Sequence, residues 1–327
     1  MKRRLKLLLP ILGALLAFFA LLIGSKEAVE GAREGLSLCA RIIIPSLLPF
    51  LMISSLLSQL GLPRYLGRLA APLMKKLFGV GGNGAAAFVL GITGGYPIGA
   101  SVVSEMYRTG QISKDEAQRL LAFCNNSGPA FIIGAAGVGV FSSPATGLLL
   151  YGIHICAAVA VGMLMSGRPS AKERKAGEVQ AHFQASRFAT ALSKSVRNAT
   201  NTVINICGFV ILFSVLTGVL DALGMFSSVA GYIAVRGGLE LGWVRSLLAG
   251  FLEISGGIGS MEGMPATPPN LALAAFILGW GSLSVQCQVL AVIEGTGLKS
   301  ARHFAGRLLH GVISAVLALV LFTVLGF

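Results

Sequence analysis

The chain has 327 residues, of which 54% are apolar and only 12% are charged. Because soluble globular proteins carry about 25% charged residues, this composition excludes a water-soluble fold and indicates an integral membrane protein. The net charge of +13 does not indicate a nucleic-acid partner, since the basic residues stand in short clusters beside apolar segments, as the positive-inside rule predicts.

Residues 1–25 predict an N-terminal transmembrane helix. Basic residues precede an apolar run at 7–24, which is close to the length of about 20 residues that crosses a bilayer. No A-x-A cleavage sequence follows the run, so we expect the helix to be retained and its N-terminus to be cytoplasmic. The mixed-charge segment 26–41 then lies outside, and the span 42–60 returns inward.

Two interrupted apolar segments follow. Residues 85–103 contain Gly94-Gly95-Tyr96-Pro97, and basic residues flank the segment at both ends. Because both ends then lie on the cytoplasmic side, the segment predicts a re-entrant hairpin rather than a crossing. Residues 120–140 are interrupted by Asn125-Asn126-Ser127-Gly128-Pro129, and residues 146–165 predict a crossing helix.

A polar linker at 167–194 is expected to be cytoplasmic and to divide two gate-like repeats, at 26–166 and 195–327. The second repeat predicts a span at 203–220, a segment 247–264 broken at 255–257, a segment 271–293 broken near 279–282, and a last helix at 308–327. The basic residues before that last helix, with Arg307 among them, are expected at the cytoplasmic surface.

Two internal matches indicate a duplication. Residues 50–62 match 213–225 at a separation of 163, and Gly91–Gly95 matches Glu253–Gly257 at a separation of 162. The first copy begins outside and the second begins inside, so the copies are inverted in the membrane. The expected fold is therefore an all-α membrane protein, an inverted repeat of transmembrane helices with re-entrant hairpins and broken helices. Paired breaks in inverted repeats are typical of secondary transporters.

The breaks supply the candidate substrate-binding residues. In hydrocarbon each backbone N–H and C=O needs a partner, so an interrupted helix persists only where protein or water covers it. The freed backbone groups can then hold a solute. The candidates are Thr93, Gly94, Gly95, Tyr96, Pro97, Asn125, Asn126, Ser127, Ser255, Gly256, Gly257, Ser282 and Ser284. The alternative is that these residues pack helices closely or tie the broken backbone together.

Three further polar features carry their own alternatives. Glu253 is a carboxylate in an apolar segment, which predicts a coupling role, or else a partner for Arg245 or a structural hydrogen bond. Ser284 and Gln288, spaced i and i+4, share one helix face and form the expected inward pair. The three asparagines at 198, 201 and 205 also share a face, and either line a pathway or seal a helix end.

No catalytic or cofactor chemistry is indicated. The cysteines and histidines are scattered singly, without disulfide or metal-ligand spacing. Walker, H-E-x-x-H and G-x-S-x-G sequences are missing, so ATP-driven pumping and hydrolysis have no support. We expect a protein that is not an enzyme, with no cofactor and no metal.

Three stretches carry a resemblance to a known family: Pro45–Phe50, Gly94–Ala100 and Phe123–Pro129. They are similar to the sporulation integral membrane proteins of endospore-forming bacteria, within the nucleoside-recognition gate domain family, which resembles the concentrative nucleoside transporters. The resemblance implies a multi-pass protein of the cell membrane or outer forespore membrane that carries dipicolinic acid, a small planar dicarboxylate.

The leading hypothesis is a secondary transporter or facilitator for a small organic anion, with that anion and the lipid bilayer as its partners. One alternative is a non-transporting membrane scaffold of a sporulation complex, and another is a nucleoside transporter. Homo-oligomerisation is open at this stage.

Overall fold

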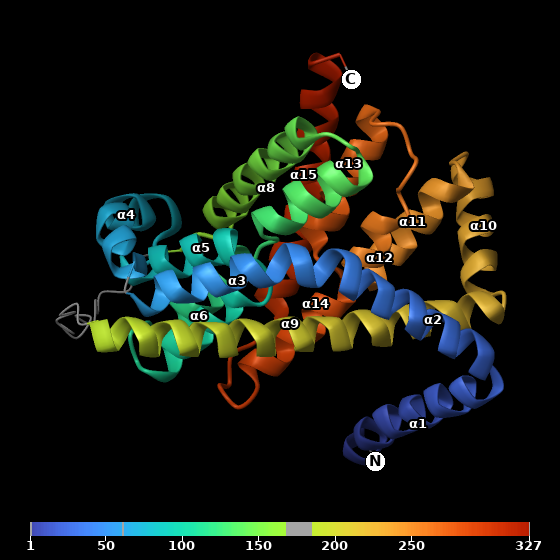
Figure 1. Cartoon of the computed structure of the whole chain (residues 1–327), viewed down its shortest axis with the longest axis horizontal. Helices are drawn as coiled ribbons and strands as arrows, with labels where there is room; N and C mark the ends of the chain where they lie inside the picture. Colours follow the sequence, from blue (N-terminus) through green and yellow to red (C-terminus); the bar gives the residue numbers. More distant parts are fainter. Residues whose placement is uncertain (1, 61, 168–184, 327) are drawn as a thin grey trace.

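The computed structural model describes residues 2–60, 62–167 and 185–326, and these contain helices and no strand (Figure 1). The first half comprises α1 (Lys2–Ile23), α2 (Ser25–Leu38), the π-helix η1 (Cys39–Ile43), α3 (Ile44–Gln59), α4 (Leu62–Phe78), α5 (Asn83–Gly94), α6 (Ile98–Arg108), α7 (Lys114–Phe123), the π-helix η2 (Ala130–Val140) and α8 (Pro144–Leu164). The second comprises α9 (Ala185–Ala222), α10 (Met225–Gly237), α11 (Leu241–Leu252), α12 (Ile254–Gly259), α13 (Pro268–Trp280), α14 (Ser282–Ile293) and α15 (Ala301–Val324).

Within the described residues, four helical stretches are long and apolar enough to cross a membrane. They are Pro144–Leu164, Phe188–Ala222, Pro268–Ile293 and Ala301–Val324. The bent pair α1–α2, with 97° between its two parts, brings the number to five if it is taken as one span. The fold is therefore that of a multi-pass helical membrane protein, as the composition predicts.

The element order of the first half recurs in the second. Each half has a long helix, a shorter helix, a helical hairpin, a helix broken at its middle and a closing helix. In the first half these are α2–η1–α3, α4, α5–α6, α7–η2 and α8, and in the second they are α9, α10, α11–α12, α13–α14 and α15. This recurrence gives the inverted-repeat architecture that the two internal matches predict.

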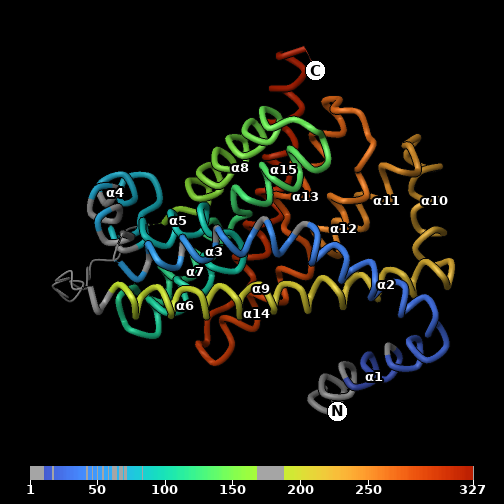
Figure 2. Tube along the Cα trace, viewed as in Figure 1, coloured from blue at the N-terminus to red at the C-terminus, as the bar shows by residue number. Residues whose placement is uncertain are grey.

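The two long helices lie side by side and run antiparallel (Figure 2). A Cβ on Gly31 would lie 2.8 Å from the Ser214 carbonyl oxygen, and one on Gly35 would lie 2.9 Å from the Ile211 Cα. The glycines at i and i+4 thus let two backbones approach, which is a usual way to pack helices in lipid. The hairpins and broken helices are held beside this pair.

Local sequence signals position the broken helix of the first half. The Ser113 hydroxyl accepts from the Glu116 backbone N–H at 3.3 Å while the Glu116 carboxylate accepts from the Ser113 N–H at 2.9 Å, a capping box that starts α7. The other Glu116 oxygen accepts from Gly81 N–H at 3.2 Å, which ties the start of hairpin α5–α6 to α7. The break that follows α7 is therefore fixed relative to the hairpin.

Three sequence predictions need correction. The segment 247–264 breaks at Glu253, where φ is −144° and ψ is 125°, whereas 255–257 lie inside α12. The matching hairpins begin at Asn83 and Leu241, which are 158 residues apart rather than 162. The linker prediction 167–194 covers 168–184, which lie outside the described residues, and from Ala185 onward the chain is helical.

The shift in the hairpin match has a physical reason. A Cβ on Gly91 would lie 3.3 Å from the Gly99 Cα, and one on Gly257 would lie 2.1 Å from the Gly250 Cα. These contacts close the two legs of each hairpin, so Gly257 corresponds to Gly99 rather than to Gly95 at the tip. The match at a separation of 162 pairs two similar glycine doublets of which the first forms a hairpin tip and the second lies inside α12.

Candidate functional site

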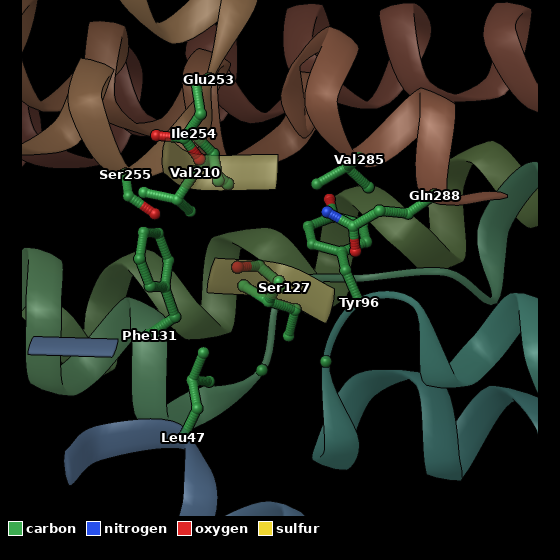
Figure 3. Close-up of a pocket in the computed structure, with 13 residues that line it drawn as sticks. Leu47, Tyr96, Ser127, Phe131, Val210, Glu253, Ile254, Ser255, Val285 and Gln288 are labelled. Atoms are coloured by element: carbon green, nitrogen blue, oxygen red, sulfur yellow. The ribbon is translucent and has the colours of Figure 1, made fainter. Parts of the chain in front are cut away.

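One pocket is lined by both hairpins, both broken helices and both long helices. Its free volume, open mouth included, is about 450 Å³. The lining residues are Leu47, Gly95, Tyr96, Ser127, Gly128, Phe131, Ile206, Val210, Glu253, Ile254, Ser255, Val285 and Gln288. Figure 3 shows Tyr96 and Gln288 on one side of the pocket and the Glu253–Ser255 segment with Phe131 on the other. Both hairpin breaks, the break of the first broken helix and the α14 segment of the second broken helix therefore meet at one cavity.

The tip of the first hairpin reaches the pocket through Gly95 and Tyr96. Gly95 has φ +78°, a conformation that favours glycine, and a Cβ there would lie 3.1 Å from the Gly128 N. The Tyr96–Pro97 peptide bond is cis. The buried Tyr96 hydroxyl donates to the Leu278 carbonyl of α13 at 3.1 Å. The first hairpin is thus joined to the broken helices of both halves.

The break between α7 and η2 contributes Ser127 and Gly128 to the pocket, whereas its two asparagines turn into the protein. Asn125 and Asn126 are fully buried. Asn125 Oδ1 accepts from Ala100 N–H at 3.3 Å, and Asn126 Nδ2 donates to the Phe123 carbonyl at 2.7 Å. Their side chains hold the interrupted backbone and the hairpin together, which is the second of the two roles that the sequence left open.

The second hairpin contributes Glu253, which is 5% exposed. Its carboxylate accepts from Gly256 N–H at 2.6 Å and so caps α12. Arg245, the alternative partner suggested by the sequence, donates instead to Asp221 at 2.7 Å. The Glu253 carboxylate therefore faces the pocket with a structural hydrogen bond and without an arginine.

The break in the second broken helix lies at Gly281 and Ser282, with φ of +79° and +71°. Ser282 Oγ accepts from Val285 N–H at 3.4 Å and starts α14. Ser284 is buried but does not line the pocket, whereas Gln288 does. Of the predicted inward pair, only Gln288 therefore reaches the cavity.

The structure thus divides the predicted site residues into two groups. Those that line the pocket are Gly95, Tyr96, Ser127, Ser255 and the coupling candidate Glu253. Those that do not are Thr93, Gly94, Pro97, Asn125, Asn126, Gly256, Gly257, Ser282 and Ser284. Thr93 is exposed and donates to Val89 O within its own helix. The apolar lining residues were missed, because helical periodicity does not distinguish a side chain that faces a pocket from one that faces the core.

A second cavity, of about 910 Å³ with its open mouth, lies between α9 and the α3, α5 and α6 helices. Asn198 and Asn201 line it, so two of the three asparagines on that face border open space, and Asn205 does not. Leu51 and Ile98 line this second cavity and belong to an apolar cluster that also includes Leu47, which lines the first. The apolar cluster therefore borders both cavities.

Behind the pocket lies a buried polar cluster that sequence reasoning missed. Arg307 is fully buried in α15, and His154 of α8 and His310 of α15 lie near it, with the two imidazole centroids 4.3 Å apart. Sequence reasoning placed Arg307 at the surface, because α15 was expected to start at residue 308 rather than at Ala301. The sequence feature that indicates this cluster is the presence of two histidines, His154 and His310, inside apolar spans. Among the described residues, no three His, Cys, Asp or Glu side chains gather as a metal site would require.

Comparisons with known proteins agree with this architecture. The domain family described as nucleoside recognition (Gate) matches residues 40–144. CNTnw, a concentrative nucleoside transporter, has a similar fold: a double variant in an outward-facing state gives a TM-score of 0.59 at 14% identity over 99% of this chain and 86% of that chain. An inward-facing, substrate-bound CNTnw structure gives a TM-score of 0.50 at 15% identity, with 99% and 86% covered.

A curated relative gives the family. The sporulation integral membrane protein YlbJ of Bacillus subtilis (strain 168) is 32% identical over 319 residues, covering 90% of this chain and 78% of the relative. Identity at this level over nearly the whole chain exceeds what apolar composition alone produces, and the polar breaks fall inside the matched region. The chain therefore belongs to the family of sporulation integral membrane proteins that includes YlbJ.

Proposed function

We propose that the chain is a secondary transporter or facilitator of a small organic anion, with dipicolinic acid as the substrate during sporulation. The observation that carries the proposal is the convergence of both hairpins and both broken helices on one pocket. A scaffold would need close packing at the breaks, but it would not need an open cavity there. A carrier needs such a cavity, since the solute binds where interrupted backbone is covered.

The pocket chemistry suits a flat solute with carboxylate ends. Its walls are largely apolar, with Tyr96 and Phe131 able to lie against a ring. Ser127, Ser255 and Gln288 offer hydrogen-bond donors in the lining. Two helices, α6 and η2, also begin at breaks whose residues line the pocket, and helix N-termini favour anions. An apolar pocket with a few hydrogen-bond donors suits an aromatic dicarboxylate.

Glu253 adds a condition to this proposal. Two negative charges in one membrane-buried pocket repel strongly at low dielectric, so an anion and an ionised Glu253 would compete. We therefore assign Glu253 the role of the coupling residue, which takes up a proton when the anion binds. Transport of the anion would then be accompanied by a proton, and a pH gradient would drive it.

The test is uptake of labelled dipicolinate into proteoliposomes that contain the purified full-length chain. Saturable uptake that unlabelled dipicolinate competes away is expected, and empty liposomes are the control. Absence of flux from protein whose cooperative thermal unfolding shows that it is folded would refute the carrier.

A nucleoside transporter is the second candidate, because the matched domain is described as nucleoside recognition and the CNTnw fold is similar. The same liposomes distinguish the two. Competition by uridine or adenosine at concentrations where dipicolinate has no effect would favour the nucleoside, and the reverse order would favour the anion.

A further inference from the structure

Arg307 is a positive charge within α15, one of the helices long and apolar enough to cross a membrane. Its side chain is fully buried, and among the described residues no Asp or Glu pairs with it. A buried charge is strongly destabilising unless protein groups compensate it. Its compensation must therefore come from uncharged groups.

Those groups are the carbonyls that the two broken helices leave free. Arg307 donates to the Asn125 carbonyl at 2.9 Å, just beyond the C-terminal end of α7. It also donates to the Gly279 carbonyl, in the last turn of α13. Each helix C-terminus carries roughly half a negative charge. Two such ends, one from each half, together offset one guanidinium.

The remaining contacts of Arg307 join the same elements. It donates to Asn126 Oδ1 at 3.2 Å and to the Tyr96 hydroxyl at the tip of the first hairpin. One side chain thus reaches both broken helices and one hairpin tip, and Tyr96 lines the pocket. Loss of this side chain would release three elements at once.

The two neighbouring histidines, His154 and His310, are uncharged in this arrangement. His154 Nε2 accepts from the Ser127 N–H at 3.1 Å, so its ring is neutral in this arrangement. His310 Nδ1 lies 3.0 Å from an Arg307 nitrogen, and because arginine only donates, this nitrogen of His310 accepts. Both rings are neutral hydrogen-bond acceptors toward the cluster.

We infer that Arg307 is a positioning residue whose fixed guanidinium holds the two broken helices together, through the kinds of group that coordinate a bound cation in broken-helix carriers. In broken-helix transporters, unwound carbonyls and half-helix C-termini coordinate the coupling ion. Here the same kinds of group are already occupied by a side chain. The two broken helices in this chain are therefore held together without an alkali cation.

Thermal unfolding of the full-length protein in detergent tests the inference without any transport measurement. Arg307→Ser leaves the carbonyls of Asn125 and Gly279 facing an empty space of the guanidinium's size. We expect a lower Tm in choline chloride and a recovery of roughly 3 °C or more when guanidinium at about ten times its Kd fills that space, at millimolar levels far below those that denature proteins. Wild type should not respond.

Arg302→Ser is the matched control. Arg302 lies on the same helix, but it is half exposed and pairs with Asp115 at 2.9 Å, so its loss should change the Tm little and create no response to guanidinium or alkali cations. An Arg307→Ser protein with the Tm of the control and no cation response would overturn the inference. A wild-type protein that sodium or potassium stabilises would overturn it as well.

If Arg307→Ser does not fold, the Tm values of Arg307→Lys and Arg307→Gln test the inference instead. Lysine keeps the charge and glutamine keeps hydrogen bonding without it. We expect the lysine variant to melt higher, and an equal or higher Tm for glutamine would refute the role of the charge. The inference concerns the site of the proposed carrier. The Tm measurements test the role of Arg307 whether or not the protein transports a solute. Where uptake is measured, wild-type flux should be equal in sodium, potassium and choline media.

Discussion

Gly91→Ala should separate the first hairpin from the break that it packs against. A Cβ on Gly91 would lie 1.6 Å from the Cys124 carbonyl oxygen, whereas ordinary contact begins at 3.4 Å. The hairpin leg α5 and the segment after α7 must therefore move apart by about 1.8 Å, the difference between these distances. Because the atom in the way is backbone, no side-chain rotation relieves the overlap.

The energetic outcome follows from two opposing effects. Overpacking of a close contact costs about 1–3 kcal/mol, with the upper end expected against a carbonyl. Alanine gains about 1 kcal/mol over glycine in a helix. The net loss is therefore about 1–2 kcal/mol, and the displacement also moves Ser127 and Gly128 at the pocket edge.

Gly152→Ala is the matched control, because a Cβ on Gly152 of α8 would have nothing within 4 Å of it. Only the helix propensity changes there, so the Tm should stay constant or rise. Thermal unfolding in detergent, with and without dipicolinate, compares the two variants. A Gly91→Ala protein that melts as high as Gly152→Ala, with the same response to solute, would refute the close contact and its link to the pocket.

Three other substitutions test the site. Glu253→Gln should remove the dependence of uptake on a pH gradient while solute-induced stabilisation persists, and gradient-dependent uptake in this variant would exclude a coupling role. Gln288→Ala should weaken solute binding several-fold in a titration whereas Ser284→Ala should not, because only Gln288 lines the pocket; equal effects would contradict the pocket geometry. Asn126→Ala should lower stability by about 1–3 kcal/mol, since it removes the buried hydrogen bonds of this side chain to the Phe123 carbonyl and to Arg307, and an unchanged Tm would argue against that network.

The breaks show which parts of the fold can be predicted from the local sequence. Gly94-Gly95-Tyr96-Pro97 and Asn125–Pro129 interrupt apolar runs with residues that end or start helices, and α5, α6, α7 and η2 begin or end beside them. The break of the second hairpin is harder to predict from the sequence, because the glycine doublet lies beyond the true break at Glu253. A glycine permits both a turn and a close helix contact, so its local sequence does not say which role it has.

The direction in which side chains point at the site cannot be predicted from the local sequence. Asn125 and Asn126 stand beside Ser127 in the sequence, but only Ser127 lines the pocket. The asparagines point to partners in α6, α7 and α15, from Ala100 to Arg307. In a non-helical stretch no periodicity fixes which side chains face the cavity. Contacts that distant segments supply decide the direction.

The sequence by itself determined the membrane class, the first hairpin, three of the four breaks and the two-half architecture, because apolar run length and helix-breaking residues act locally. Only the tertiary structure decided that both hairpins and both broken helices meet at one pocket and that Arg307 lies behind it. The reason is physical: a buried arginine is compensated by carbonyls at Asn125 and Gly279, far from it in the chain. Such compensation exists only once the halves are packed together.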